Sequence, residues 1–347
     1  MKILLTADPM IEVPPVGYGG IERIVDALVR EYGRRGHEVG LVARTGSTSP
    51  AARLYVWPSE NPRAIANTLR NTNALRKAVR DFQPDVLHSF SRLAYMMPLL
   101  PTKLPKLMSY QRHTGGRQVS IGSKLAGKTL LFTGCSEFIC QQARPSGGQW
   151  QAIHNFVEPE RFTFVPAVAD DAPLVFLSRL DCIKGADTAI AMAKRAGRRL
   201  ILAGNHAQDG HEFQYWRSEI EPHLGRNGIE WVGEVDDAAK NELLGKAAAL
   251  LVPIRWDEPF GIVFAEALAC GTPVISCPRG ALPEIVDEGK TGFLVRNEQE
   301  GGVAVSRVST LSRAACRKAA EERFSVGVCA QQYLDAYSAM IKASSSR

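Results

Sequence analysis

The segment 257–274 places two carboxylates around the start of a predicted helix. Glu258 precedes the helix and Glu266 lies two turns inside it, so the carboxylates lie at different depths. Pro259 suits the first turn, where its missing N–H group is not needed, and the N–H groups of Gly261 to Val263 could bind a diphosphate. The pattern predicts that the two glutamates hold hydroxyls of two different rings. An ordinary helix with two solvated glutamates is the alternative, and it fits the apolar neighbours of Glu266 poorly.

Two cations follow an earlier apolar run. Arg179 and Lys184 come after the expected strand 174–177, with four residues between them. A guanidinium and an ammonium there could bracket a diphosphate leaving group and stabilise its charge as it departs. Such a pair removes the need for a divalent metal, and the sequence has no Asp-x-Asp motif to hold one, so we expect neither a metal nor a cofactor. A surface ion pair of Arg179 with Asp181 or Asp187 is the alternative.

A glycine-rich loop at residues 14–20 precedes the first long helical pattern. Glycines allow a backbone to approach a ligand closely. The loop is not a dinucleotide-binding fingerprint, because Glu22 stands where a third glycine is needed; a plain turn at a helix start is the other interpretation. His113 follows the expected strand 106–110, and a lone histidine is more often structural than functional.

Short apolar runs and helical patterns alternate along the whole chain. The runs cover residues 2–7, 38–43, 85–88, 106–110 and 130–133, and then 174–177, 199–203, 229–232, 249–252 and 273–276. Such alternation predicts an α/β fold with two doubly wound parallel sheets. In the helical segment opened by Pro62, the spacing predicts a buried stripe of Ile65, Leu69, Leu75, Val79 and Phe82.

The composition is that of an ordinary globular chain, and its 347 residues suffice for two domains. No apolar run approaches the ~20 residues of a membrane-spanning helix. Residues 1–8 are too short and too soon interrupted for a signal peptide. Seven scattered cysteines without metal-like spacing indicate reduced thiols, and hence a cytoplasmic location.

Positive charge is concentrated in the first half of the chain. Through Val157 there are 20 Lys and Arg against 10 Asp and Glu, a net charge of +10, whereas the remainder has 22 against 26, a net charge of −4. This asymmetry predicts a phosphate-bearing or lipid-linked acceptor, or peripheral contact with an anionic membrane at its inner face; a well-solvated surface is the alternative. No nucleic-acid-binding module is present, so we expect no such partner. The cations concerned are Arg63, Arg70, Lys77, Lys103, Lys106, Arg112, Arg117, Lys124 and Lys128.

Together these motifs resemble the family 4 retaining glycosyltransferases, which belong to glycosyl transferases group 1 and have the GT-B fold. In residues 257–274 the resemblance rests on the two glutamates, the Pro-Phe-Gly after the first, and the closing Gly-Thr-Pro-Val. The segments 19–39, 153–157 and 177–185 are also similar to segments of that family. The resemblance therefore runs through nearly the whole chain.

The resemblance implies transfer of a hexosyl residue, with retention of configuration and without a metal, from a nucleotide-diphosphate sugar. The acceptor would be a glycan, a lipid-linked molecule or a small molecule, as in polysaccharide biosynthesis, and the choice among UDP, GDP and ADP stays open. The implied catalytic residues are Glu258, His113, Arg179 and Lys184. The implied donor-binding residues are Gly19, Gly20, Arg179, Lys184, Glu258, Phe260, Gly261, Ile262, Val263, Glu266, Asn205 and Glu234, the last two lying against the nucleobase.

The GT-B resemblance also implies two Rossmann-like domains that face each other across a cleft. We expect an acceptor-binding domain at 1–157, a linker at 158–172, a nucleotide-sugar-binding domain at 173–323, and a C-terminal helix at 324–347 that crosses back to the first domain. Two alternatives share this architecture: a nucleotide-sugar epimerase and a non-catalytic nucleotide-sugar-binding protein. The complete set of charged site residues argues against a decayed site.

Overall fold

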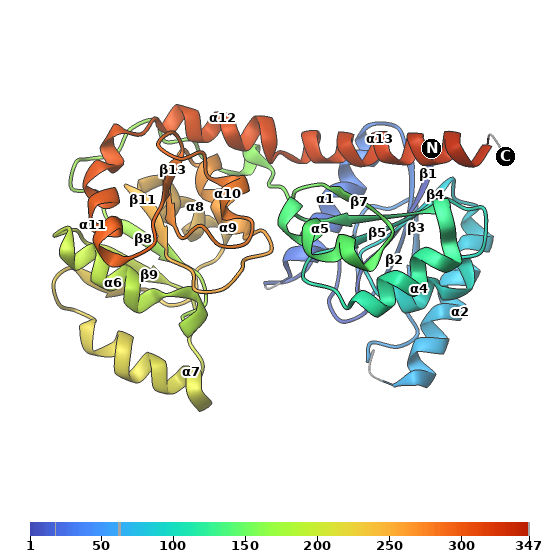
Figure 1. Cartoon of the computed structure of the whole chain (residues 1–347), viewed down its shortest axis with the longest axis horizontal. Coiled ribbons are helices and arrows are strands. Elements are labelled where there is room, and N and C mark those ends of the chain that lie inside the picture. The colour runs from blue at the N-terminus through green and yellow to red at the C-terminus, as the bar shows by residue number, and fades with distance from the viewer. Residues whose placement is uncertain (18, 62–63, 346–347) are drawn as a thin grey trace. The chain divides into compact units, whose positions relative to one another are not determined.

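The computed structural model describes residues 1–17, 19–61 and 64–345, which form two compact units (Figure 1). The first unit is Met1–Phe156 together with the C-terminal segment that begins at Val326, and the second is Val157–Ser325. Each unit is built on one sheet with helices packed around it (Figure 1). The predicted α/β class with two parallel sheets is thereby confirmed.

The first unit contains a seven-stranded sheet in the order β3-β2-β1-β4-β5-β6-β7, and all its neighbouring strands are parallel. The direction of the strand order reverses between β1 and β4, as a doubly wound sheet requires. The strands are β1 (Lys2–Thr6), β2 (Glu38–Ala43), β3 (Arg53–Val56), β4 (Val86–Ser89), β5 (Lys106–Tyr110), β6 (Leu130–Gly134) and β7 (Gln149–Ala152). The helices are α1 (Gly20–Arg34), α2 (Ile65–Phe82), α3 (Leu93–Met96), α4 (Gly116–Ala126), α5 (Glu137–Ala143) and α13 (Val326–Ser345).

The second unit contains a six-stranded parallel sheet in the order β10-β9-β8-β11-β12-β13. Its strands are β8 (Leu174–Leu177), β9 (Leu200–Ala203), β10 (Ile229–Trp231), β11 (Ala249–Val252), β12 (Val274–Ser276) and β13 (Gly292–Leu294). Its helices are α6 (Ala186–Arg195), α7 (Gly210–Tyr215), α8 (Asp237–Lys246), α9 (Ile262–Ala269), α10 (Leu282–Ile285), α11 (Glu298–Arg307) and α12 (Arg313–Arg323). Because all strands are parallel, the loops that follow them emerge at one edge of the sheet.

Helix α2 corrects the predicted apolar stripe. Its buried face runs through Asn71, Leu75 and Phe82, whereas Ile65 is 80% and Leu69 is 59% exposed. Leu69 precedes Asn71 by two residues, which is about 200° around a helix, so the two side chains point to different faces. Asn71 takes the inward position because its amide accepts the N–H of Ser59 and donates to its carbonyl. Pro62 and Arg63 lie outside the described residues.

The segment 158–172, expected to be a linker, packs on the second unit. The buried guanidinium of Arg313 donates to the carbonyl of Val165 at 2.6 Å, and Arg317 donates to the carbonyls of Pro159 and Phe162 at 3.0 and 2.9 Å. Phe324 also belongs to this unit, because its carbonyl accepts the N–H of Val157 at 2.8 Å. Arginine side chains from α12 thus satisfy the polar backbone of a segment that has little regular structure of its own.

A buried polar network holds α13 to the sheet of the first unit. His88 on β4 is fully buried; its Nδ1 bonds the hydroxyl of Tyr337 on α13, and its Nε2 lies 2.7 Å from the hydroxyl of Ser109 on β5. Tyr337 in turn lies 3.1 Å from the hydroxyl of Tyr32 on α1. Burial holds the pKa of His88 well below its ordinary value, so the imidazole is neutral in the folded chain.

The first unit is expected to lose stability as the pH falls below about 6.5, the ordinary pKa of histidine. The folded pKa of His88 is lowered, so the unfolded chain binds the extra proton first, and stability decreases by up to about 1.4 kcal/mol per pH unit until the folded pKa is reached. The free energy of urea unfolding of wild type and His88→Gln, measured at pH 7.5 and 5.5, tests this expectation. Gln keeps two hydrogen-bonding groups but cannot titrate, so equal pH dependence of the two proteins would contradict it.

Candidate active site

The loops that follow β8 and β11 carry most of the predicted charged residues. Both strands lie in the middle of the second unit's sheet and pair with each other. The loop after β8 contains Arg179 and Lys184, and the loop after β11 contains Glu258. A pair of adjacent parallel strands thus brings together residues that are far apart in sequence.

Lys184 and Glu258 form a direct ion pair. The Lys184 Nζ donates to the Glu258 Oε2 at 2.6 Å, and only 14% and 11% of the two side chains is exposed. The indole N–H of Trp256 donates to the same oxygen at 3.0 Å, and Nζ lies 4.7 Å from the centre of the Trp256 ring. The carboxylate is therefore fixed by two donors, and the ammonium is held between a carboxylate and an aromatic face.

Arg179 has a different surrounding. Its guanidinium lies 2.8 Å from the carboxylate of Asp181, and 59% of its side chain is exposed. The surface ion pair considered as an alternative for Arg179 is thus present, with Asp181 as the partner. Asp187 instead accepts from Arg255 and from the Tyr215 hydroxyl. An exposed arginine with a single acidic partner can exchange that partner for a phosphate group without moving far.

The helix after β11 begins later than predicted. Helix α9 starts at Ile262, and Gly261 precedes it with φ 79°, so Pro259 lies outside the first helical turn. Gly261 is required there: a Cβ would meet the Phe264 ring at 2.6 Å. Phe260, included among the expected donor-binding residues, is 1% exposed and packs edge-on against Phe324 with ring centres 5.7 Å apart. Its side chain therefore belongs to the core of the second unit.

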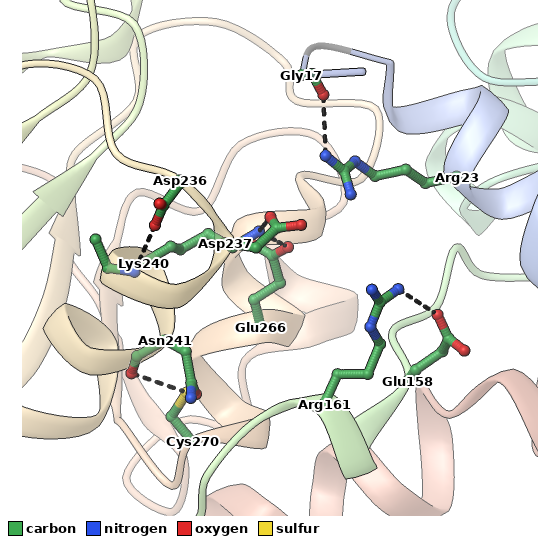
Figure 2. Close-up of polar contacts among 11 residues, drawn as sticks. Gly17, Arg23, Glu158, Arg161, Asp236, Asp237, Lys240, Asn241, Glu266 and Cys270 are labelled. Atoms are coloured by element: carbon green, nitrogen blue, oxygen red, sulfur yellow. Dashed lines mark hydrogen bonds and ion pairs between the residues drawn. The ribbon is translucent and has the colours of Figure 1, made fainter. Parts of the chain in front are cut away.

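Glu266 is held by a lysine that the sequence did not single out. The Lys240 Nζ on α8 donates to Glu266 Oε1 at 2.6 Å and lies 3.1 Å from Asp237 (Figure 2). Burial opposes the charge on Lys240, but the two carboxylates outweigh it and raise the pKa of the lysine. Figure 2 also shows Asn241, one residue further along α8, in contact with Cys270 at the end of α9. Helix α8 therefore fixes the position of Glu266.

The residues expected against a nucleobase lie after β9 and β10. Asn205 and Glu234 are both exposed, and the Asn205 carbonyl accepts the N–H of Leu180 at 2.8 Å. Trp231, which ends β10, was not predicted as a site residue; it is 38% exposed and packs against Trp216 with ring centres 4.8 Å apart. In the sequence, the feature that could have indicated a stacking surface was the position of Trp231 just before the loop that contains Glu234.

Three glycines fix the loops of the second unit by close backbone contacts. A Cβ on Gly185 would lie 2.2 Å from the carbonyl oxygen of Pro253, and one on Gly204 would lie 2.0 Å from that of Ser178. A Cβ on Gly280 would lie 2.2 Å from the carbonyl oxygen of Glu258. All three have positive φ angles, which only glycine adopts readily. The loops with Arg179, Lys184 and Glu258 therefore rest on glycines of neighbouring loops.

Gly19, Gly20 and His113 lie in the first unit. Gly19 has φ 148° and precedes α1, which starts at Gly20; the Gly19 carbonyl accepts the N–H of Arg23. The Arg23 guanidinium also donates to the carbonyl of Gly17 at 3.0 Å (Figure 2). His113 is exposed after β5, and its Nδ1 lies 3.0 Å from the amide oxygen of Gln142.

Two carboxylates near this glycine loop were not predicted. Glu22 in the first turn of α1 is 4% exposed, and Asp8 follows β1. Burial raises the pKa of Glu22, and the charge of Asp8 raises it further; burial also raises the pKa of Asp8. Neither residue belongs to a recognisable sequence motif, so the sequence did not indicate that the two carboxylates interact. In the described ranges 1–17, 19–61 and 64–345, no three His, Cys, Asp or Glu side chains come together to hold a metal ion.

Comparison with known proteins follows the same division of the chain. Residues 18–161 match the model of Glycosyltransferase Family 4, and residues 159–321 match that of Glycosyl transferases group 1. The chain is 27% identical to glycogen synthase of Mycobacterium tuberculosis over 90% of this chain and 86% of that protein.

Solved structures share the fold over nearly the whole length. A glycosyltransferase involved in avilamycin A biosynthesis is 26% identical, with a TM-score of 0.72 and 98% of both chains covered. HepE of Anabaena is 18% identical, with a TM-score of 0.72, 98% of this chain and 100% of that chain covered. Fold and matches together define a glycosyltransferase that uses a nucleotide-sugar donor. The chain belongs to glycosyl transferases group 1, family 4, with the GT-B fold.

Proposed function

We propose that this enzyme moves a hexosyl residue from a nucleotide-diphosphate sugar to its acceptor with retention of configuration and without a metal. The observation that carries the proposal is the cluster of Lys184, Glu258 and Trp256, in which the loops after β8 and β11 hold a fixed ammonium against a fixed carboxylate. An ammonium can neutralise the charge that develops on a departing diphosphate, which a metal does in other transferases.

The proposed roles follow from the contacts of each side chain. Lys184 binds the diphosphate as a point charge, and Arg179 leaves Asp181 to bind it as a fork. Glu258 accepts hydrogen bonds from hydroxyls of the transferred sugar, with His113 as a further partner of that sugar. Glu266, positioned by Lys240, accepts from the ribose hydroxyls. The N–H groups of Gly261, Ile262 and Val263 and the glycines Gly19 and Gly20 approach the phosphates.

In the proposed step the bond between the anomeric carbon and the diphosphate oxygen breaks, and the nucleoside diphosphate leaves with the electron pair. The acceptor oxygen forms its bond to the anomeric carbon on the same face, and a phosphate oxygen of the donor takes the acceptor proton. Neither Glu258 nor Glu266 serves as a nucleophile in this step, because the proposal assigns both carboxylates to hydroxyl groups of the donor. The proposal therefore differs from the two-carboxylate scheme of glycosidases.

For the donor we propose a UDP-sugar, whose base stacks on the exposed face of Trp231 between Asn205 and Glu234. A half-exposed tryptophan next to polar side chains suits a flat heterocycle. The solved structure of HepE holds UDP and glucose, which supports the choice of this nucleotide. For the acceptor we propose a growing or lipid-linked glycan in polysaccharide biosynthesis inside the cell.

The donor proposal predicts metal-independent release of one nucleotide. Purified protein incubated with UDP-, GDP- and ADP-sugars in the presence of EDTA should release UDP alone, by hydrolysis or transfer to added glycans. Mass spectrometry of the remaining donor separates the alternatives: an isomerised nucleotide sugar would indicate an epimerase, and tight binding without release under any acceptor would indicate a binding protein. Release that requires added Mg²⁺ would contradict the proposed role of Lys184.

We also propose that the first unit contacts an anionic membrane through α2, where Ile65 and Leu69 are exposed alongside Arg70 and Lys77. Apolar side chains flanked by cations suit the headgroup region of a bilayer. Lys106, counted among the surface cations, is instead buried, and burial lowers its pKa to about 8. No described helix is both long and apolar enough to cross a membrane.

Sedimentation with vesicles tests this contact. Binding to vesicles that contain an anionic lipid should exceed binding to neutral vesicles and decrease as salt is raised from 0.05 to 0.5 M, since salt screens surface charges over about 10 Å. The double variant Ile65→Ser/Leu69→Ser should reduce binding several-fold. The matched control is Val303→Ser, at an exposed apolar position of the second unit, which should bind like the wild type. Equal binding to neutral and anionic vesicles would refute the proposal.

A further inference from the structure

A hollow lies at the carboxyl edge of the second unit's sheet, where β11, β12 and β13 end. Its volume is about 520 Å³, which is within the range of sites that bind small molecules. Among the described residues its walls come from the loops after these three strands, from the start of α11 and from Thr188 on α6. Arg179, Lys184, Glu258 and Glu266 are not part of the walls, so the proposed donor residues do not account for it.

Three arginines line this hollow: Arg255, Arg279 and Arg296. Arg255 already binds the carboxylate of Asp187 and the hydroxyl of Thr188. Arg279 and Arg296 have no acidic partner among the described residues. The lining contains one acidic residue, Glu298, against the three arginines. Outside the lining, Asp187 pairs with Arg255, and the Glu300 carboxylate accepts the backbone N–H of Arg296 and the side-chain amide of Asn297.

The guanidinium groups of Arg255 and Arg279 both lie close to the thiol of Cys277. Burial raises the pKa of the Cys277 thiol in the wall, the charges of Arg279 and Arg255 lower it, and the weaker effect of Glu300 raises it, as expected when both cations are close to one sulfur. The ten-residue helix α11 begins at Glu298 and directs the positive end of its dipole to the same wall. Two unpaired guanidiniums, a partly satisfied third and a helix start thus surround one space.

We propose that this hollow binds the phosphate group of a small phosphorylated metabolite, at a site separate from the donor site. Guanidinium groups match the oxygens of a phosphate with two parallel hydrogen bonds, and they do so better than a lysine. The volume exceeds what a phosphate group fills, and the amide of Gln299 in the wall can bond the hydroxyls of an attached sugar. The ligand class is therefore a sugar phosphate rather than an inorganic anion alone.

The site is tested with glucose 6-phosphate, inorganic phosphate and glucose as probes in isothermal titration calorimetry. Glucose 6-phosphate should bind the wild type more tightly than inorganic phosphate does, and glucose should not bind. Arg279→Ala/Arg296→Ala should bind it at least tenfold more weakly, while the matched control Arg226→Ala, an exposed arginine elsewhere in the unit, should equal the wild type. UDP binding should be the same in all three proteins, which separates this site from the donor site.

A second readout needs no variant. The thiol of Cys277 is partly exposed, so its alkylation by iodoacetamide, followed by mass spectrometry, should slow several-fold when glucose 6-phosphate is added to the wild type. Equal affinity of the double variant and the wild type, absence of binding to the wild type at millimolar concentration, displacement of the sugar phosphate by UDP, or an unchanged rate at Cys277 would each overturn the proposal.

Discussion

Replacing Lys184 with methionine is expected to reduce transferase activity by about 10²–10³-fold, the usual effect of removing one group that stabilises transition-state charge. Methionine keeps an unbranched apolar side chain that reaches as far as the lysine Cε, but it removes the ammonium that lies 2.6 Å from Glu258 and 4.7 Å from the centre of the Trp256 ring. Initial rates of nucleotide release, with donor affinity measured separately, show whether the loss falls on the chemical step. Glu258→Gln, which keeps the acceptor oxygen, is expected to lose less.

The matched control uses an ion pair on the surface of the same unit. Lys246 pairs with Glu242 one helical turn away, and 71% and 63% of their side chains is exposed, so Lys246→Met should leave activity and stability unchanged. Lys184→Met also leaves the Glu258 carboxylate mostly buried without a cation, which should lower stability. The double variant Lys184→Met/Glu258→Gln should therefore be more stable than Lys184→Met, although equally inactive. Activity within threefold of wild type for Lys184→Met would exclude the proposed mechanism.

The sequence predicted the interior of both sheets well and three of their edges not at all. β2, β5, β8 and β11 coincide with predicted apolar runs, because a central parallel strand is buried on both faces. β3, β7 and β13 lie at sheet edges and were not predicted. Most residues of β3 and β7 are partly or fully exposed, and β13 has only three residues, so none shows a continuous apolar run.

Candidate site residues could be predicted where the residue type and its place after a strand suggest a chemical role. They could not be predicted where a contact depends on how two helices pack. Glu258 and Lys184 were identified from their loops, and their contact follows from the pairing of β8 with β11. Lys240 could not be identified, because its role depends on how α8 packs beside α9. The partner of Arg179 could be predicted, because Asp181 is close to it both in sequence and in space.

Replacing Gly280 with alanine is expected to disrupt the site although residue 280 has no side chain to contribute. Its φ is +58°, and a Cβ would lie 2.2 Å from the carbonyl oxygen and 2.4 Å from the nitrogen of Glu258. The loop cannot withdraw without breaking the bond from the Ala281 N–H to the Glu258 carbonyl, which is 2.8 Å long. The backbone that carries Glu258 must therefore shift, and its carboxylate with it, so donor affinity should decrease at least tenfold.

Gly197 provides the comparison that isolates this contact. Its φ is +62°, and a Cβ there would meet no atom within 4 Å. Gly197→Ala should therefore lower the free energy of unfolding by only the cost of a left-handed alanine, about 1–2 kcal/mol, and leave donor binding intact. Gly280→Ala carries the same backbone cost plus the displacement of Glu258, so urea unfolding and nucleotide titration should separate the two variants. If both bind donor like the wild type, the backbone of Glu258 tolerates the shift, and the position of its carboxylate is not what the site requires.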